Sequence, residues 1–192
     1  MLRIGITGGI GSGKSIVARI VESLNFPVFY SDKVAKELIA TDAEIKNGLI
    51  QLFGQNLFSN GTLNRAKLAE HIFTDEAAKL KVNALIHPKV RTAFEEFVQQ
   101  QQNSIVFNEA AIIFETESAH LYDKVILVTA PKEVRIERVQ ERDKISRNKV
   151  LERMENQWTD EKKIPLADFQ IINDNQQSLI EQVNAILQDL SK

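Results

Sequence analysis

The chain has 192 residues, of which 43% are hydrophobic and 26% charged, a composition that excludes extended disorder and fibrous architectures. Its 24 Lys and Arg residues against 26 Asp and Glu residues give a net charge of -2, so neither nucleic acid nor an anionic membrane surface is indicated as a partner. The absence of cysteine excludes disulfides, thiolate metal sites and cysteine nucleophiles. At the N-terminus the apolar run is too short for the core of a signal peptide, and no stretch elsewhere could span a membrane, so we expect a cytoplasmic protein. No obligate protein partner is predicted.

Five short apolar runs have the length and composition of buried strands. They cover residues 2–7, 27–30, 105–109, 124–129 and 169–173. Helical patterns separate them, with apolar residues repeated on one helical face after the first run and again near the C-terminus. Strands that alternate with helices favour parallel pairing through crossover helices, so an α/β layer fold is predicted.

The stretch between the second and third runs has an almost wholly helical pattern. A capping box from Thr41 to Glu44 is expected to begin one helix, and Gly54 to end it. Asn60-Gly61 predicts a turn, Asn64 is expected to cap the next helix, and Pro88 to open a later one. So long a helical insertion in an α/β core suggests a subdomain that covers a ligand.

Residues 8–15, Gly-Gly-Ile-Gly-Ser-Gly-Lys-Ser, match the phosphate-binding loop pattern G-x-x-x-x-G-K-[ST]. An apolar strand precedes the loop and an amphipathic helix follows it, as phosphate binding requires. Glycines permit positive φ and let several N–H groups converge on a phosphate, to which the start of the helix adds partial positive charge. Lys14 is expected to reach the β- and γ-phosphates and Ser15 to ligate Mg²⁺, so a nucleoside triphosphate with Mg²⁺ is the predicted ligand.

The loop alone does not separate a GTPase, a motor-like ATPase and a small-molecule kinase. Guanine-specific GTPases use a D-x-x-G switch and an N-K-x-D base reader. No glycine here has Asp three positions before it, and Asn148-Lys149 begins a base reader that lacks its acid. A signalling GTPase is therefore disfavoured.

A kinase needs a carboxylate near the acceptor hydroxyl. Asp32 directly follows the second strand, and the carboxyl ends of strands in open α/β sheets face the ligand crevice. Asp32 is therefore the candidate catalytic base, with a helix N-cap as its alternative. Glu109 ends the third strand and either holds Mg²⁺ through water or is a surface-loop acid.

Residues 132–163 hold many of the basic residues of the chain, interleaved with acidic ones. One interpretation is a solvated helix with i,i+4 ion pairs. The other is a mobile lid that excludes water and whose guanidinium groups neutralise the transferring phosphates. Arg138 and Arg142 are four residues apart and so share one helical face.

Taken in order, these motifs resemble those of the dephospho-coenzyme A kinases over nearly the whole chain. The resemblance rests on residues 5–15, Ser31-Asp32, Phe53-Gly54, Leu63-Asn64-Arg65, Leu68, Phe73, His87-Pro88, Ile112-Ile113-Phe114-Glu115, Arg142-Asp143, Gln157, Ala167-Asp168 and Asn173-Asp174-Asn175. It implies ATP-dependent phosphorylation of the ribose 3′-hydroxyl of dephospho-CoA, the last step of CoA biosynthesis. The substrate is then a small molecule, and the enzyme a phosphotransferase with an alcohol group as acceptor.

The resemblance also implies a nucleotide-kinase-like P-loop core with a five-stranded parallel sheet, a helical substrate-binding insertion and a helical lid. The expected core covers residues 1–32, 103–137 and 164–192, the CoA-binding insertion 33–102, and the lid 138–163.

By the same resemblance, Asp32 matches the proposed catalytic base and Arg142 a lid arginine near the nucleotide. Arg65 and His87 match motifs of the substrate side, although His87 alone would be a helix-entry residue before Pro88. The ATP-binding positions are Gly11, Ser12, Gly13, Lys14, Ser15, Ile16 and, in the adenine-side loop, Asn175.

The chain departs from the family pattern at three positions. Ile16 stands where Thr is usual, Tyr30 replaces the first acid of the usual Asp-Ala-Asp, and Ala111 replaces a proline. Two other functions stay open from the residues themselves: a different small-molecule or nucleoside monophosphate kinase, and a nucleotide-gated binding protein. The three differ in which acceptor, if any, stimulates ADP release.

Overall fold

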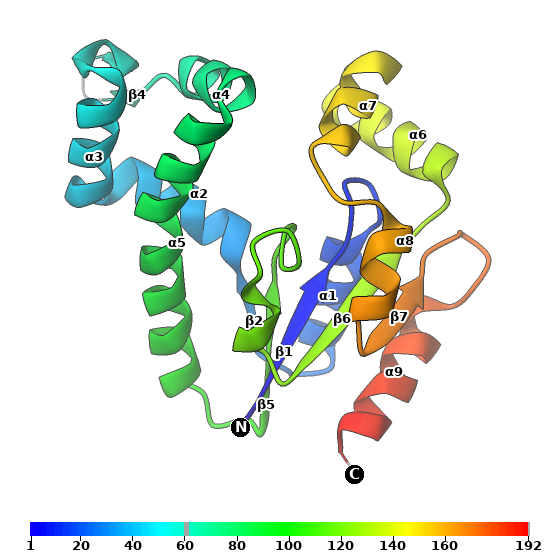
Figure 1. The fold of residues 1–192 in the computed structure, drawn as a ribbon. Helices are drawn as coiled ribbons and strands as arrows, with labels where there is room; N and C mark the ends of the chain where they lie inside the picture. Colours follow the sequence, from blue (N-terminus) through cyan, green and yellow to red (C-terminus); the bar gives the residue numbers. More distant parts are fainter. Residues whose placement is uncertain (60–61, 192) are drawn as a thin grey trace. The chain divides into compact units, whose positions relative to one another are not determined.

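The chain divides into two compact units, Met1–Tyr30 with Gln101–Lys192, and Ser31–Gln100. The computed structural model describes residues 1–59 and 62–191, without the side chains of residues 65, 73, 74 and 76 (Figure 1). No helix in these described ranges is long and apolar enough to cross a membrane.

The first unit is built on a five-stranded sheet in the order β2-β5-β1-β6-β7 (Figure 1). All four neighbouring pairs are parallel. The strands are β1 Leu2–Thr7, β2 Val28–Tyr30, β5 Ile105–Glu109, β6 Lys124–Thr129 and β7 Phe169–Ile172. The α/β fold and its five-stranded parallel sheet are thus confirmed, each strand within one residue of its predicted range.

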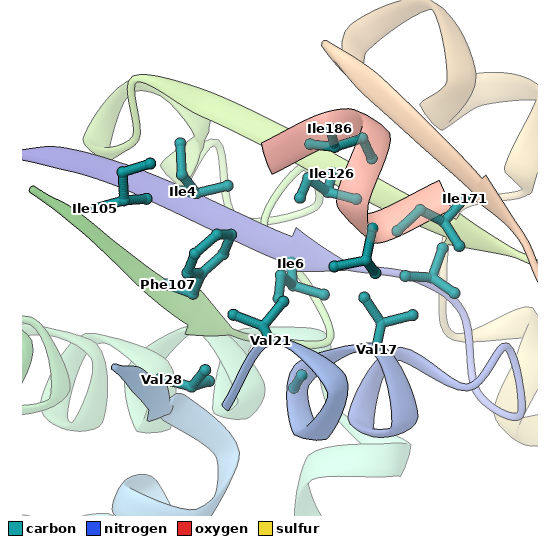
Figure 2. Close-up of a cluster of buried hydrophobic side chains, with 13 residues drawn as sticks. Ile4, Ile6, Val17, Val21, Val28, Ile105, Phe107, Ile126, Ile171 and Ile186 are labelled. Carbon is teal, nitrogen blue, oxygen red and sulfur yellow. The ribbon is translucent and has the colours of Figure 1, made fainter. Parts of the chain in front are cut away.

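Alternate residues of the strands pack on opposite faces of this sheet, as the two-residue period of a strand requires. On β6, Ile126 and Val128 join a core with α1 (Lys14–Ser23) and α9 (Leu179–Leu190). Figure 2 shows Ile126 in this core together with Val17 of α1 and Ile186 of α9. Val125 and Leu127 instead pack with Ile113 and other apolar residues outside the sheet. Both faces of the central strands are therefore covered, which explains why β5 and β6 are almost unbroken apolar runs.

Residues 132–163 form three short helices, α6 Lys132–Asp143, α7 Arg147–Glu155 and α8 Asp160–Lys163. Ile136 and Val139 of α6 and Val150 of α7 are buried together. Two charged side chains are buried as well, Arg135 at 8% exposure and Lys163 at 0%. The interpretation as a single solvated helix is therefore wrong, because this segment has its own apolar contacts and buried cations.

The helices of the second unit surround a separate apolar core. They are α2 Ser31–Thr41, α3 Ala43–Phe53, α4 Arg65–Thr74 and α5 Glu76–Gln99, with a 3-10 turn at Gln55–Leu57 and a hairpin of β3 Phe58–Ser59 and β4 Thr62–Leu63. Ile45, Leu49, Leu57 and Leu68 are buried in this core. The insertion is thus mostly helical, and the hairpin is an element that the sequence analysis missed. The predicted Asn60-Gly61 turn lies outside the described residues.

Two of the predicted helix boundaries in this unit are confirmed and one is displaced. Gly54 ends α3 with φ 82°, and Asn64 caps α4 by accepting a hydrogen bond from the Lys67 N–H. The cap of α3 is Asp42 rather than Thr41, because Thr41 still belongs to α2 and the Asp42 carboxylate accepts from the Ile45 N–H.

Pro88 does not open a helix, since it lies inside the 24-residue helix α5. A proline within a helix removes one backbone hydrogen bond and crowds the preceding turn, which costs about 3 kcal/mol. Val82 and Ile86 before it and Val90 after it all pack into the same core. Apolar contacts on both sides of Pro88 therefore keep the helix continuous where the local rule predicts a boundary.

Replacing Phe107 with alanine is expected to lower the free energy of unfolding by about 3–5 kcal/mol. Phe107 is fully buried on β5 and packs edge-on against Phe26, so its loss leaves a cavity in the sheet core. Urea unfolding measures the change. Ile180→Ala on α9, where the side chain is 48% exposed, is the matched control and should change stability by less than about 0.5 kcal/mol. Equal losses in the two variants would contradict the packing described above.

Candidate active site

The phosphate loop connects β1 to α1 and requires glycine at two positions. Gly11 and Gly13 have φ angles of 78° and 94°, a region that other residues rarely adopt. A Cβ on Gly11 would lie 2.5 Å from the carbonyl oxygen of Arg135, and one on Gly13 would overlap the side-chain amide of Asn173. The loop is therefore shaped both by its own backbone and by what packs against it.

Three side chains bind the three successive carbonyl oxygens of the loop. Arg135 Nε donates to the Ile10 oxygen at 2.9 Å, and Arg138 Nη1 to the Gly11 oxygen at 3.4 Å. Asn173 Nδ2 donates to the Ser12 oxygen at 2.8 Å. A loop whose carbonyl oxygens are satisfied in this way can present its remaining N–H groups to an anion.

Lys14 and Glu109 form an ion pair at the carboxyl end of the sheet. Lys14 Nζ lies 3.5 Å from Glu109 Oε1, and the two side chains are 16% and 7% exposed. Glu109 is the last residue of β5 and is in register with Ile6 of β1 and Tyr30 of β2. Because it is buried beside the loop lysine, the interpretation of Glu109 as a surface-loop acid is wrong.

Asn175 lies in the loop after β7 and has a left-handed backbone with φ 67°. Its Oδ1 accepts a hydrogen bond from Arg138 Nη2, which also donates to both oxygens of Asn173. Arg138 thus joins the phosphate loop to the loop that contains Asn175, and it does so from α6.

Arg142, one turn further along α6, has a different environment. Its Nε is 2.7 Å from Asp143 Oδ1, and 61% of its side chain is exposed. Arg153 binds the other oxygen of Asp143 at 2.6 Å, and these guanidinium groups, Arg142 first, lower the pKa of Asp143 below its ordinary value. Of the two arginines that share this face of α6, the structure brings Arg138 rather than Arg142 to the phosphate loop.

Three of the predicted site residues belong to the Ser31–Gln100 unit. Asp32 is exposed and is the second residue of α2, so it is not an N-cap. His87 is half-buried on α5, where burial and then the charge of Arg91 lower its pKa and leave the ring neutral at pH 7. Its place inside α5 also rules out the helix-entry role. Arg65 begins α4, and its side chain lies outside the described part of the structure.

Ser15 and Ile16 follow Lys14 in the first turn of α1, and both are exposed. The first turn of a helix carries partial positive charge and N–H groups without intrahelical partners, which favours an anion there. Together with Lys14 and the glycines, they complete a site whose geometry suits the phosphates of a nucleotide.

Comparison with known proteins agrees with this geometry. The family model described as dephospho-CoA kinase matches residues 2–178. The chain belongs to the dephospho-CoA kinase family. A dephospho-CoA kinase from Bacteroides fragilis (strain YCH46) is 39% identical over 183 residues, which are 95% of this chain and 89% of the relative.

Solved structures support the same family and fold. TT1252 from Thermus thermophilus is 32% identical with a TM-score of 0.90, covering 100% of this chain and 98% of that one. The dephospho-CoA kinase from Campylobacter jejuni is 29% identical with a TM-score of 0.70, covering 98% and 96%. The resemblance found in the sequence is therefore confirmed, and the chain has the fold of a P-loop kinase.

Two residues that hold the loop in this member of the dephospho-CoA kinase family were not predicted as site residues. Arg135 and Gln157 contact Ile10 from 125 and 147 residues away in the chain. Gln157 appeared only as part of the family pattern, and no spacing rule points to Arg135. The density of arginine in residues 132–163 was the one signal available, and it does not say which arginine faces the loop.

Proposed function

We propose that this protein transfers the γ-phosphoryl group of ATP to the ribose 3′-hydroxyl of dephospho-CoA, giving CoA and ADP. The observation that supports it best is the phosphate loop with Lys14 and buried Glu109, set in a chain of the dephospho-CoA kinase family. Phosphoryl transfer depends mainly on positioning and on neutralising charge, and these residues do both.

The phosphate loop binds the triphosphate. Its N–H groups and the first turn of α1 bind the phosphate oxygens, and Lys14 neutralises the charge that develops on the transferring group. Lys14 already lies beside a carboxylate, so its ammonium group is held near the loop before the nucleotide binds. Asn175 and its loop are proposed to lie on the adenine side.

The residues present suit Mg²⁺, which prefers oxygen ligands and keeps several waters and phosphate oxygens. Ser15 offers a hydroxyl in the first turn of α1, and Glu109 a buried carboxylate. No group of three or more His, Cys, Asp or Glu side chains suited to a metal occurs in the part of the chain that the structure describes. When bound, Mg²⁺ would neutralise phosphate charge, with Ser15 as its protein ligand.

Asp32 is proposed to accept the proton of the acceptor hydroxyl. It follows the end of β2 by two residues, in the first turn of α2. Its side chain is exposed to solvent and therefore accessible to a substrate. Residues 33–102, with Arg65 and His87, are proposed to bind dephospho-CoA.

Residues 138–163 are proposed to act as a lid that excludes water during transfer, since an open site would hydrolyse ATP. Arg142 is the arginine proposed to approach the nucleotide when the lid closes. Its side chain is 61% exposed and pairs with the partly buried Asp143, and an ion pair with an exposed partner of this kind contributes little.

ADP release with ATP and Mg²⁺ tests the proposal directly. Dephospho-CoA is expected to stimulate release strongly and to yield CoA, whereas AMP, CMP, shikimate and gluconate are expected to leave release at its acceptor-free level. Stimulation by one of the other acceptors alone would keep the phosphate site and reject the substrate. No stimulation by any acceptor would indicate a nucleotide-gated binding protein.

A further inference from the structure

A buried ion pair joins the loop after β5 to the last part of the proposed lid, and neither of its two residues has yet been given a role. Lys163 Nζ, at the end of α8, is 2.6 Å from Glu115 Oε1, and the two side chains are 0% and 11% exposed. The backbone N–H of Trp158 donates to the same oxygen at 3.1 Å. Glu115 belongs to the loop that follows β5, so the pair joins this loop to residues 157–163.

The pair is poorly explained as a source of stability. Glu115 Oε2 and Asp160 Oδ1 are buried without a hydrogen-bond partner among the described residues. Burial also raises the pKa of Asp160 above its ordinary value, although Arg135 and Lys163 oppose the shift. Because desolvation offsets the attraction in buried ion pairs, apolar replacements of similar volume are often neutral or stabilising. Because burying these charged side chains costs free energy that an apolar replacement would not cost, their presence indicates a role other than stabilising the fold.

Residues 157–163 contact the phosphate loop at one residue, Ile10. Gln157 Oε1 accepts a hydrogen bond from the Ile10 N–H at 2.7 Å. Arg135 Nε donates to the Ile10 oxygen at 2.9 Å, while its Nη1 binds Asp160 Oδ2 at 3.2 Å. Both backbone polar groups of Ile10 are therefore held by residues 157–163, one directly and one through Arg135.

We infer that Glu115 and Lys163 are positioning residues for ATP binding. Their ion pair fixes residues 157–163. Gln157, and Arg135 through its contact with Asp160, then hold the backbone of the phosphate loop at Ile10. The loop then has its binding conformation before the nucleotide arrives, and ordering it adds no cost to binding. The inference rests on ATP being the ligand of the loop, as in the proposed function, but not on the identity of the acceptor.

Two variants test this inference, one at the contact between Gln157 and Ile10 and the other, called the pair variant, at the ion pair between Glu115 and Lys163. Gln157→Ala removes the acceptor of the Ile10 N–H. Glu115→Gln with Lys163→Met removes both buried charges, yet keeps their volume and an oxygen that can accept from Trp158. Each is expected to raise the Kd for ATP about tenfold, the size of effect seen when a buried polar group loses its partner. The KM for dephospho-CoA should change by less than about twofold, since the contacts concern the nucleotide side.

Lys124→Gln is the matched control. It breaks an ion pair in the same unit, Lys124 with Asp168 at 2.8 Å, in which the side chains are 48% and 33% exposed. Such a pair contributes little, and it does not contact Ile10, so the Kd for ATP should stay at its original value. Urea unfolding of all variants separates lost affinity from lost stability.

Combining the substitutions decides between positioning and a merely structural role. The triple variant combines Gln157→Ala with Glu115→Gln and Lys163→Met. If the ion pair and Gln157 both act through Ile10, this variant should bind ATP only about tenfold more weakly than the original protein, because once one contact is lost the other has no further effect on the loop. Kd values for ATP come from calorimetry without any acceptor, so they stand apart from the acceptor assay.

An unchanged Kd for ATP in the pair variant would overturn the inference. So would a Kd in the triple variant that rises by the product of the two separate effects. Failure of both the pair variant and Glu115→Gln alone to fold would overturn it as well. The last would mean that the pair serves folding. Should only the pair variant fail to fold, Glu115→Gln takes its place in the same comparison.

Discussion

Replacing Asp32 with asparagine is expected to lower the turnover of dephospho-CoA by about 10²–10⁴-fold, the usual contribution of a general base. Asparagine has the same shape but cannot accept the proton of the acceptor hydroxyl. The Kd for ATP should stay close to its original value, because the groups proposed to bind phosphate are Lys14, the loop and the first turn of α1. Initial rates at saturating ATP and acceptor, with calorimetric ATP binding, measure both quantities.

Stability should hardly change in this variant. Asp32 is exposed and lies in the first turn of α2, where a negative charge contributes only about 0.3–1 kcal/mol through the helix dipole. Glu37→Gln, at another exposed acid on the same helix, is the control and should retain full turnover. Unchanged turnover in Asp32→Asn would reject this residue as the base and leave the phosphate site as it is.

The strands could be predicted because their pattern is local. A parallel strand with both faces covered is a short run of apolar residues, and each of the five in the sheet is such a run. The phosphate loop could be predicted for the same reason, since its motif is eight consecutive residues. Two glycines of that motif, Gly11 and Gly13, have the positive φ angles that the loop requires. The family resemblance then supplied what local pattern does not contain, the acceptor.

The features that could not be predicted from the sequence depend on tertiary contacts. The prediction of a helix boundary at Pro88 was wrong because apolar residues on both sides of Pro88 pack into one core. Arg138 rather than Arg142 contacts the phosphate loop, and this depends on which turn of α6 lies beside that loop and the loop after β7. The partners of Ile10 come from more than a hundred residues away, so no spacing along the chain carries that information.

Replacing Lys14 with alanine is expected to lower turnover by about 10²–10³-fold, as loss of one group that stabilises transition-state charge usually does. The Kd for ATP should also rise, because the ammonium group is proposed to contact phosphate before and during transfer. The same assays as for Asp32→Asn measure both, and the two variants should differ: Asp32→Asn loses turnover alone, whereas Lys14→Ala loses turnover and affinity. Normal turnover in a folded Lys14→Ala protein would contradict the proposed reaction.

The ion pair between Lys14 and Glu109 allows catalysis and stability to be separated. Lys14→Ala removes the cation 3.5 Å from a carboxylate that is only 7% exposed, so the unfolding free energy of the nucleotide-free protein should fall by about 1–3 kcal/mol. Adding Glu109→Gln removes the buried charge and should restore most of that stability while turnover stays low. Urea unfolding measures the restoration. If stability stays low in the double variant, the loss comes from the packing of the lysine stem rather than from the buried charge.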